Sequence, residues 1–397
     1  MNLLQDNDVT LLNTLNLATS CTDVRLVKDP GEMLEYLFQR DAEERNHVKI
    51  CGELSNTVIG EGVTGPLLLF REGQDIKFEQ HADSVTVKVP ASFSFDTLVN
   101  ILCEEGIAGV EMLSGIPGTV GAAVVQNIAA YGQKISDVFL SARAFDIAAG
   151  ALLNLNADDL LFSYRSSALK PRDRYTPGKI LLDVALKCGS PDKLQKIQHT
   201  EILALHREYG QSLEDPVARR TAVLQVRERK GMVVGGANWL PSAGSYFLSP
   251  VLPKEVALDL AEQIRGHDFA SSFLTWYQPD ATTTRFPAAL ALRAAGFMNG
   301  DTWGKVGLSP HHILAICTYP GATGSDVIAL SDIVRAQVTE RLGISLEPEV
   351  RLLGNFTRID LDTLRKEYVP GVGEPSWALG LGAPEEGSGD RERGGQT

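Results

Sequence analysis

Paired cysteine motifs are absent from this sequence of 397 residues. An odd number of cysteines, none of them in a C-x-x-C motif, gives neither a disulfide framework nor a zinc site, and it fits a reducing compartment. The five lie far apart, at Cys21, Cys51, Cys103, Cys188 and Cys317. No H-E-x-x-H motif occurs, and the adjacent His311 and His312 would point to opposite faces of a strand. We therefore expect no metal site.

Long apolar runs and an excess of basic residues are also lacking. No stretch approaches the roughly 18 uncharged apolar residues of a membrane span. The N-terminal MNLLQDNDVT carries aspartates but no Lys or Arg, unlike a secretory signal peptide. The formal net charge is −13, whereas binding to nucleic-acid phosphates needs a basic surface. We therefore expect a cytoplasmic protein with no nucleic-acid partner and no membrane insertion.

The patterns that are present change along the chain. Its length predicts two or three domains. Up to about residue 190, strand-like runs such as SVTVKVP alternate with amphipathic helical patterns such as EMLEYLFQRDAEE and FDTLVNILCEE, the second of which ends before Gly106. Helical patterns then dominate. The clearest is SDVIALSDIVRAQVTERLG, which Thr323 or Ser325 can cap and Gly343 can end. This order predicts an α+β protein.

One stretch is rich in glycine, alanine and proline: LSGIPGTVGAAVVQNIAAYG, from Leu113 to Gly132. Its glycines allow a backbone to approach another group closely, and Pro117 fixes a turn. Consecutive unobstructed N–H groups can form a nest that binds a diphosphate. A tightly packed loop without a ligand explains the composition equally well. No G-x-G-x-x-G fingerprint follows a strand, so a Rossmann dinucleotide site is not supported.

Five motifs follow one another along the chain after Asn13-Thr14: CGELSN, GIPGTVGAAVVQNIAAYG, FSYRSS, SAGSYFLSP and LEPEVRLLG. Together they resemble the motifs of the UDP-N-acetylenolpyruvoylglucosamine reductase family, and the stretch RERKGMVV is most similar to actinobacterial members. The resemblance implies two FAD-binding subdomains of the PCMH/VAO type, at residues 13–70 and 71–190, and a C-terminal α+β substrate-binding domain at residues 200–354. Residues 368–397, rich in Gly, Pro and Glu, are predicted to be a disordered tail.

The resemblance also implies a reaction and its residues. FAD would be the cofactor and NADPH the hydride donor for reduction of the enolpyruvyl group of UDP-N-acetylglucosamine enolpyruvate to UDP-N-acetylmuramate, in peptidoglycan synthesis. Arg165 would stabilise charge beside the substrate carboxylate, Ser245 would donate a proton, and Glu349 would be the acidic partner. Residues implied near the substrate are Tyr209, Lys230 and Ser249. Those implied around FAD are Gly52, Ser55, Asn56, Gly115, Ile116, Pro117, Gly118, Val120, Gly121, Asn127, Tyr131 and Gly132.

Each catalytic candidate has a plainer explanation when it is taken alone. Arg165 could form a surface ion pair, and Ser245 could stabilise a turn. Glu349 could pair with Arg351 or face solvent. Because all three candidates lie within matched motifs, we favour the catalytic interpretation.

The sequence departs from the family pattern at both implied sites. Leu54 replaces a glycine of the flavin loop, which predicts a side chain where the backbone normally meets the flavin. Further departures are Val124 for proline, Ala129 for glycine, Ser166 for Asp, Ser249 for Asn, Leu290 for Trp, Arg293 for Glu and Thr318-Tyr319 for Asn. Two alternatives therefore remain: a paralogous FAD-dependent oxidoreductase that acts on a different small molecule in specialised metabolism, and a catalytically inactive flavin-binding protein.

Overall fold

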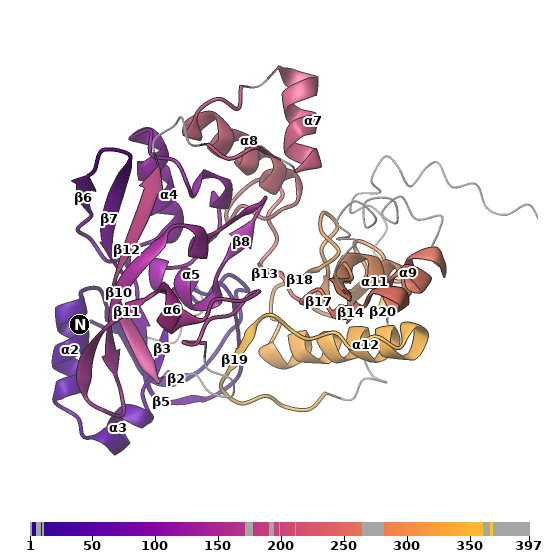
Figure 1. The fold of residues 1–397 in the computed structure, drawn as a ribbon. Coiled ribbons are helices and arrows are strands. Elements are labelled where there is room, and N and C mark those ends of the chain that lie inside the picture. Colours follow the sequence, from indigo (N-terminus) through magenta and orange to yellow (C-terminus); the bar gives the residue numbers. More distant parts are fainter. Residues whose placement is uncertain are drawn as a thin grey trace, which may run out of the picture.

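The computed structural model of the chain describes residues 2–4, 9, 12–170, 178–189, 194–197, 199–210, 212–263, 282–359 and 366–367. These residues form a larger N-terminal lobe with two main sheets and a C-terminal lobe with a third, and three two-stranded sheets accompany them (Figure 1). Helices and strands are mixed in both lobes, which confirms the predicted α+β class. The predicted disordered tail, residues 368–397, lies outside the described residues.

The first sheet of the N-terminal lobe is mostly parallel. Its strands follow the order β1–β2–β5–β3, and only the β1–β2 pair is antiparallel. The elements are β1 (Asn2–Leu4), β2 (Cys21–Val27), α2 (Pro30–Phe38), α3 (Ala42–Asn46), β3 (Lys49–Cys51) and β5 (Val63–Phe70). The helix predicted over EMLEYLFQRDAEE is split in two. The reason is a capping box, in which Asp41 accepts from the Glu44 N–H at 2.9 Å and Glu44 accepts from the Asp41 N–H at 3.0 Å.

The second sheet is antiparallel, in the order β11–β10–β12–β7–β6. This part of the chain contains β6 (Lys77–Gln80), β7 (Ser84–Pro90), α4 (Phe95–Glu104), α5 (Val120–Gln126), β8 (Ala129–Ala130), β9 (Gln133–Lys134), β10 (Phe139–Asp146), β11 (Ala151–Asn156), α6 (Ala157–Leu160) and β12 (Lys179–Gly189), with short 3₁₀ turns at Glu111–Leu113 and Ile135–Asp137. Strands β8 and β9 form a separate two-stranded sheet. The strand predicted at SVTVKVP is β7, and the helix predicted to end before Gly106 is α4. Both predictions are confirmed.

The C-terminal lobe holds the third sheet, in the order β13–β18–β17–β16–β20. Its elements are β13 (Ser242–Ser245), β14 (Val251–Pro253), α9 (Lys254–Gln263), β15 (Thr283–Arg285), α11 (Ala288–Ala294), β16 (Thr302–Trp303), β17 (Val306–Leu308), β18 (Ala315–Thr318), α12 (Gly324–Leu342) and β20 (Lys366–Glu367). The clearest predicted helix is α12. Thr323 caps it in a capping box with Asp326, and Gly343 ends it at φ +66°. Two helices, α7 (Thr200–Tyr209) and α8 (Pro216–Arg229), precede this lobe in the chain.

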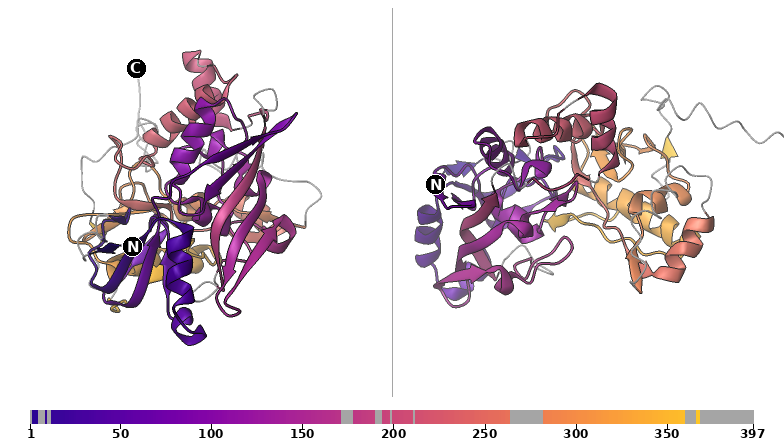
Figure 2. Two further views of the ribbon diagram at one scale, coloured as in Figure 1. Left: turned by 90° about the vertical axis from the view of Figure 1, so that its left-hand side faces the viewer. Right: turned by 45° about the horizontal axis from the view of Figure 1, so that its top comes forward.

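The two lobes share a strand pair and a core. Strand β19 (Arg351–Leu353) leaves the C-terminal lobe and pairs in parallel with β4 (Thr57–Ile59), next to the first sheet. One apolar cluster contains Leu54 and Leu67 of the N-terminal lobe together with Leu290 and Leu330 of the C-terminal lobe. A second cluster lies under the antiparallel sheet, where α4 and α5 pack. Figure 2 shows the C-terminal lobe extending from one side of the N-terminal lobe. The domain boundaries inferred from the sequence stay a prediction.

Candidate functional site

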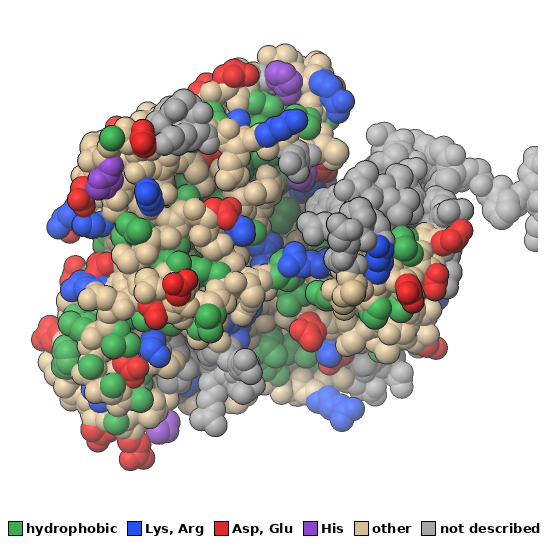
Figure 3. Space-filling model, viewed as in Figure 1, with side chains coloured by type: hydrophobic (Ala, Val, Ile, Leu, Met, Phe, Trp, Pro, Cys, Tyr) green, Lys and Arg blue, Asp and Glu red, His purple; other side chains and the backbone are tan. Residues whose placement is uncertain are grey.

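A cavity of about 810 Å³ lies between the two lobes. This volume is towards the upper end of the range typical of small-molecule sites, about 300–1,000 Å³. The molecular surface is hollowed between the lobes, and Lys and Arg side chains gather there (Figure 3). Two cavity residues bridge the lobes: the guanidinium carbon of Arg285, in β15, lies 3.6 Å from the ring centroid of Tyr164.

The loop 52–56, between β3 and β4, forms one wall of the cavity. A side chain at Gly52 would place its Cβ 2.7 Å from Thr119 Oγ1, so the close approach of these two segments requires glycine. Ser55 joins the same two segments through a 3.2 Å hydrogen bond from its Oγ to the Pro117 carbonyl. Thr14 Oγ1 donates to the Ser55 carbonyl at 3.2 Å. The CGELSN motif and the GIPG turn are therefore held against each other.

Two carboxylates occupy the backbone donors of the Gly115–Gly118 turn. Glu53 Oε2 accepts from the Gly118 N–H at 2.8 Å, and Asp96 Oδ1 accepts from the Gly115 N–H at 2.6 Å. Gly118 has φ +123° and lines the cavity. The Gly118 amide thus binds a carboxylate oxygen within the cavity lining, whereas Asp96 binds the amide of Gly115, which is not a lining residue. The diphosphate nest stays a prediction.

Leu54 keeps the backbone conformation that suits a glycine. Its φ is +55°, a region that disfavours residues with a Cβ by roughly 1–2 kcal/mol. Its side chain is 3% exposed and packs in the apolar core that the two lobes share. Leu54 also lines the cavity, so the expectation that its side chain stands where the backbone meets the flavin stays a prediction.

The stretch from Leu113 to Gly132 contains a helix, α5, where the composition suggested a loop. Thr119 caps α5 by accepting from the Ala122 N–H at 3.3 Å, and Asn127 ends it in the left-handed region at φ +46°. Asn127 binds the chain itself, donating to the Ser163 carbonyl at 2.8 Å. Its neighbour Gln126 lines the cavity instead. The helical turn decides which of the two polar side chains faces the cavity.

Arg165 lies in a tight turn in which Ser163 and Ser166 exchange backbone hydrogen bonds. Arg165 itself has φ +52°, a strained conformation for a non-glycine residue. Its carbonyl accepts from Lys170 Nζ at 2.9 Å, and its Nη1 donates to the Ala129 carbonyl at 2.8 Å. Burial lowers the pKa of Lys170. These contacts hold the guanidinium at the cavity wall.

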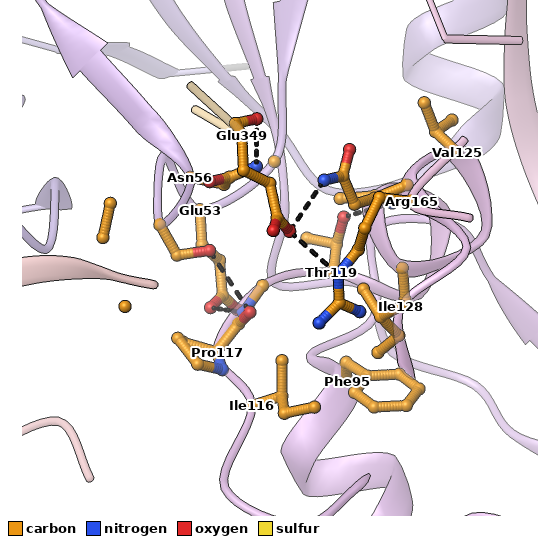
Figure 4. A pocket seen from close by; sticks show the side chains of 18 of the residues that line it. Glu53, Asn56, Phe95, Ile116, Pro117, Thr119, Val125, Ile128, Arg165 and Glu349 are labelled. Atoms are coloured by element: carbon orange, nitrogen blue, oxygen red, sulfur yellow. Dashed lines mark hydrogen bonds and ion pairs between the residues drawn. The ribbon is translucent and has the colours of Figure 1, made fainter. Parts of the chain in front are cut away.

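Glu349 lies in direct contact with Arg165 in the cavity lining. Its Oε1 lies 3.2 Å from Arg165 Nε and accepts from Gln126 Nε2 at 3.0 Å (Figure 4). The Glu349 N–H donates to the Tyr246 carbonyl at 2.7 Å, next to Ser245. The backbone of Glu349 is therefore hydrogen-bonded to the residue that follows Ser245, and the Glu349 side chain pairs with Arg165. The alternative that Glu349 faces solvent does not hold, since its side chain is only 14% exposed.

Ser245 ends strand β13, opposite Ala315 of β18. Its Oγ lies 2.9 Å from Nε2 of His312. Burial, followed by the positive charges of Lys230 and Arg227, lowers the pKa of His312 to about 4. His312 lines the cavity, whereas its neighbour His311 is exposed. From the sequence, these histidines were considered only as candidate metal ligands, and this contact was missed.

Cationic side chains gather on the α8 side of the cavity. Lys230, which caps α8, forms an ion pair with Glu201 of α7. Arg227 donates from Nη2 to the carbonyls of Gly115 and Met232 at 2.9 and 2.8 Å, and burial lowers its pKa. Burial also raises the pKa of Tyr131, which faces Arg227. This side of the cavity can attract an anionic ligand.

Most residues implied by the motifs come together in the cavity. Its lining includes Gly52, Ser55, Asn56, Ile116, Pro117, Gly118, Gly121, Tyr131, Gly132, Arg165, Lys230, Ser245 and Glu349. Gly115, Val120, Asn127, Tyr209 and Ser249 are not among the lining residues. Tyr209 is 67% exposed at the end of α7, and Ser249 Oγ accepts from the Ala288 N–H at 3.4 Å.

The cavity residues fit a flavin dinucleotide. Ile116, Ile128 and Phe95 give it an apolar wall below the polar residues (Figure 4), and Gly118 offers a donor that already holds an anionic oxygen. Among the described residues, no group of three or more His, Cys, Asp or Glu side chains is placed to hold a metal ion. None of the helices in the described ranges is long and apolar enough to cross a membrane.

Several polar cavity residues were not predicted, among them Glu53, Gln126 and His312. Gln126 was within reach of sequence reasoning, because it stands beside Asn127 in the quoted motif. Glu53 lies in the quoted CGELSN motif, but its bond to Gly118 spans 65 positions in the chain. His312 becomes visible only when β13 pairs with β18.

Comparisons with known proteins match both lobes. A family model described as FAD binding domain matches residues 21–156, and one described as UDP-N-acetylenolpyruvoylglucosamine reductase, C-terminal domain, matches residues 236–353. The chain is 34% identical over 311 residues to the UDP-N-acetylenolpyruvoylglucosamine reductase of Thermobifida fusca, covering 77% of this chain and 85% of that protein. It is 34% identical over 327 residues to that of Mycobacterium marinum, covering 79% and 86%.

A solved structure matches the fold. The crystal structure of UDP-N-acetylenolpyruvylglucosamine reductase from Thermus caldophilus aligns with a TM-score of 0.56 and 20% sequence identity. The alignment covers 89% of this chain and 98% of that one. At this identity the similarity concerns the arrangement of the elements.

Proposed function

The chain belongs to the UDP-N-acetylenolpyruvoylglucosamine reductase family, and we propose that it reduces the enolpyruvyl group of UDP-N-acetylglucosamine enolpyruvate to UDP-N-acetylmuramate for peptidoglycan synthesis. FAD is the bound cofactor and NADPH the hydride donor. The observation that carries this proposal is that Arg165, Ser245 and Glu349 all line one cavity beside the flavin loops. We further propose that the enzyme is a cytoplasmic monomer.

Arg165 is proposed to hold the substrate carboxylate and to stabilise the negative charge that develops beside it. A guanidinium has five N–H donors, so the contacts of Arg165 with Glu349 and Ala129 leave donors for a carboxylate. The strained turn and the Lys170 contact fix its position before the substrate arrives. Glu349 orients Arg165 and can hydrogen-bond the substrate carboxylate when that group gains a proton.

Ser245 is proposed to deliver the proton that completes the reduction. FAD, when bound, supplies hydride to the terminal carbon of the enolpyruvyl group. The electron pair of the double bond moves towards the carboxylate, and the other carbon takes the hydroxyl proton of Ser245. The alkoxide of Ser245 then recovers a proton from water.

The proposed binding residues lie on two sides of the cavity: the flavin loops form one side and the end of α8 the other. Loop 52–56 and the Ile116–Gly118 turn would hold the flavin and its diphosphate, with the Gly118 N–H as one donor. Lys230, with Arg227 beside it, would take the diphosphate of the UDP-sugar. Tyr209 and Ser249 remain proposals for substrate contact that would require movement, since neither lines the cavity in this structure.

A paralogous oxidoreductase for another substrate has less support from the structure. The substitutions that suggested it include Ser166, Ser249 and Leu290, and none of these residues lines the cavity. Leu290 is 1% exposed and packs in the core. The inactive flavin-binding alternative depends on Leu54, which packs in the core and also lines the cavity, and the presence of Arg165, Ser245 and Glu349 in the same cavity counts against it.

Anaerobic half-reactions test the proposal. The purified protein, loaded with FAD, should be reduced by NADPH and reoxidised by UDP-N-acetylglucosamine enolpyruvate, with UDP-N-acetylmuramate as product. Reduction by NADPH without reoxidation by this substrate would favour the paralogue. A protein that takes up no FAD would refute the flavoenzyme assignment itself.

A further inference from the structure

The hydroxyl of Ser245 has a defined partner in His312, and the fold builds this contact. β13 and β18 pair so that Ser245 lies opposite Ala315, and the Tyr246 N–H donates to the Leu314 carbonyl at 2.7 Å. The Ala315 N–H closes a turn onto the His312 carbonyl at 2.9 Å. These backbone bonds place His312 Nε2 at 2.9 Å from Ser245 Oγ. The sheet itself therefore sets the distance between the two side chains.

The surroundings of His312 keep its ring neutral. Its pKa falls to about 4 because of burial and the positive charges of Lys230 and Arg227. A neutral imidazole carries one N–H and one acceptor nitrogen. The ring can thus offer Ser245 either a donor or an acceptor, but it brings no positive charge into the cavity near neutral pH.

We infer that His312 is a positioning residue that donates its Nε2–H to Ser245 Oγ, which directs the hydroxyl proton of Ser245 into the cavity. The inference rests on the proposed function. If Nε2 accepted instead, the hydroxyl proton would point at the ring and away from the substrate. With Nε2 as donor, the C–H bond forms as the Ser245 O–H bond breaks, and the Nε2–H stabilises the alkoxide until water returns a proton.

Three substitutions separate this role from simple packing. In His312→Gln the side-chain amide nitrogen can reach the place of Nε2, whereas in His312→Asn the shorter amide reaches only the place of Nδ1. His312→Ala removes both. The matched control is His311→Gln, which makes the same change at the exposed neighbouring residue. The flavin content of each purified variant shows whether the cavity is intact.

The reaction to be measured is anaerobic reoxidation of the reduced enzyme by UDP-N-acetylglucosamine enolpyruvate. The rate at saturating substrate should fall about 10–100-fold in His312→Ala and His312→Asn, as expected for loss of a hydrogen bond to a charged group. His312→Gln should recover most of this loss. Reduction by NADPH, and the substrate concentration that gives half the maximal reoxidation rate, should change less than about twofold.

A double-mutant cycle that combines His312→Ala with Ser245→Ala is the most discriminating test. If His312 acts through Ser245, its substitution should cause no further slowing once the Ser245 hydroxyl is gone. Additive effects, equal slowing of both half-reactions, or unchanged reoxidation in His312→Asn would each overturn the inference. If the wild-type enzyme is not reoxidised at all, the proposed function fails and this inference with it. Normal wild-type reoxidation with an unaffected His312→Asn variant overturns the inference alone.

Discussion

We expect Glu53 to weaken FAD binding, because its carboxylate accepts the hydrogen bond from the Gly118 N–H, which the cofactor diphosphate would also use. Glu53 Oε2 accepts from the Gly118 N–H at 2.8 Å, and a bound diphosphate would have to displace it. A hydrogen bond to a charged group contributes about 1.5–3 kcal/mol. Because Glu53 is only partly buried, we take the lower end of this range. Glu53→Ala should then lower the dissociation constant of FAD by about tenfold, at 1.4 kcal/mol per factor of ten.

The assay is titration of the apoprotein with FAD, followed by quenching of flavin fluorescence. Glu53→Gln keeps a neutral acceptor for the Gly118 N–H and should give a smaller gain, about fivefold, since a neutral hydrogen bond contributes only about 0.5–1.5 kcal/mol. The matched control is Glu105→Ala, which removes the same charge from an exposed position after α4. If Glu53→Ala binds FAD more weakly than the wild type, Glu53 supports the cofactor and the competition argument is refuted.

Three further predictions concern the site and its frame. Leu54→Gly should lower the free energy of unfolding by about 1–4 kcal/mol, because the loss of core packing costs more than the release of backbone strain at the positive φ gains. Urea titrations measure this change, and a stabilised variant would contradict the prediction. His312 alone should lower the free energy of unfolding by about 2–3 kcal/mol as the pH falls from 6.5 to 4, because its folded-state pKa of about 4 lies below the ordinary value of about 6.5 and the unfolded chain therefore takes up the proton first. His312→Gln should flatten this part of a pH series of thermal melts, and an equal slope in both proteins would exclude His312 as the cause. Glu349→Gln removes the charge that pairs with Arg165. It should slow anaerobic reoxidation about a hundredfold and leave reduction by NADPH unchanged. Slowing of both steps would point to a structural role for Glu349.

Elements with strong local signals were predictable from the sequence. Helix α12 carries its own capping box at Thr323 and its own stop at Gly343, so no distant residue is needed to define it. Strand β7 and helix α4 follow from local periodicity in the same way. The break after α2 was missed, although the Asp41–Glu44 capping box is also local, because the apolar periodicity of the segment masked it.

The site was predictable only as far as its motifs carried it. The motifs identified Arg165, Ser245 and Glu349, but they gave no sign that Glu349 pairs with Arg165. That pair depends on residues 184 positions apart in the numbering (349 − 165), and only the folded chain brings them together. The sequence placed Leu54 in the flavin loop, but it gave no sign that Leu54 also packs in the core that the two lobes share.

The pairing of β19 with β4 bears on when the enzyme can acquire its cofactor during synthesis. Loop 52–56 lies immediately before β4, and the neighbouring core is completed by α12 and by the segment around Val350, close to the end of the described chain. When only the first half of a nascent chain has left the ribosome, the chain still lacks β19 and α12, which hold this loop in place. Flavin capture would therefore follow synthesis of the segment up to Leu353, and a ribosome stalled after residue 190 would carry a flavin motif without a flavin site.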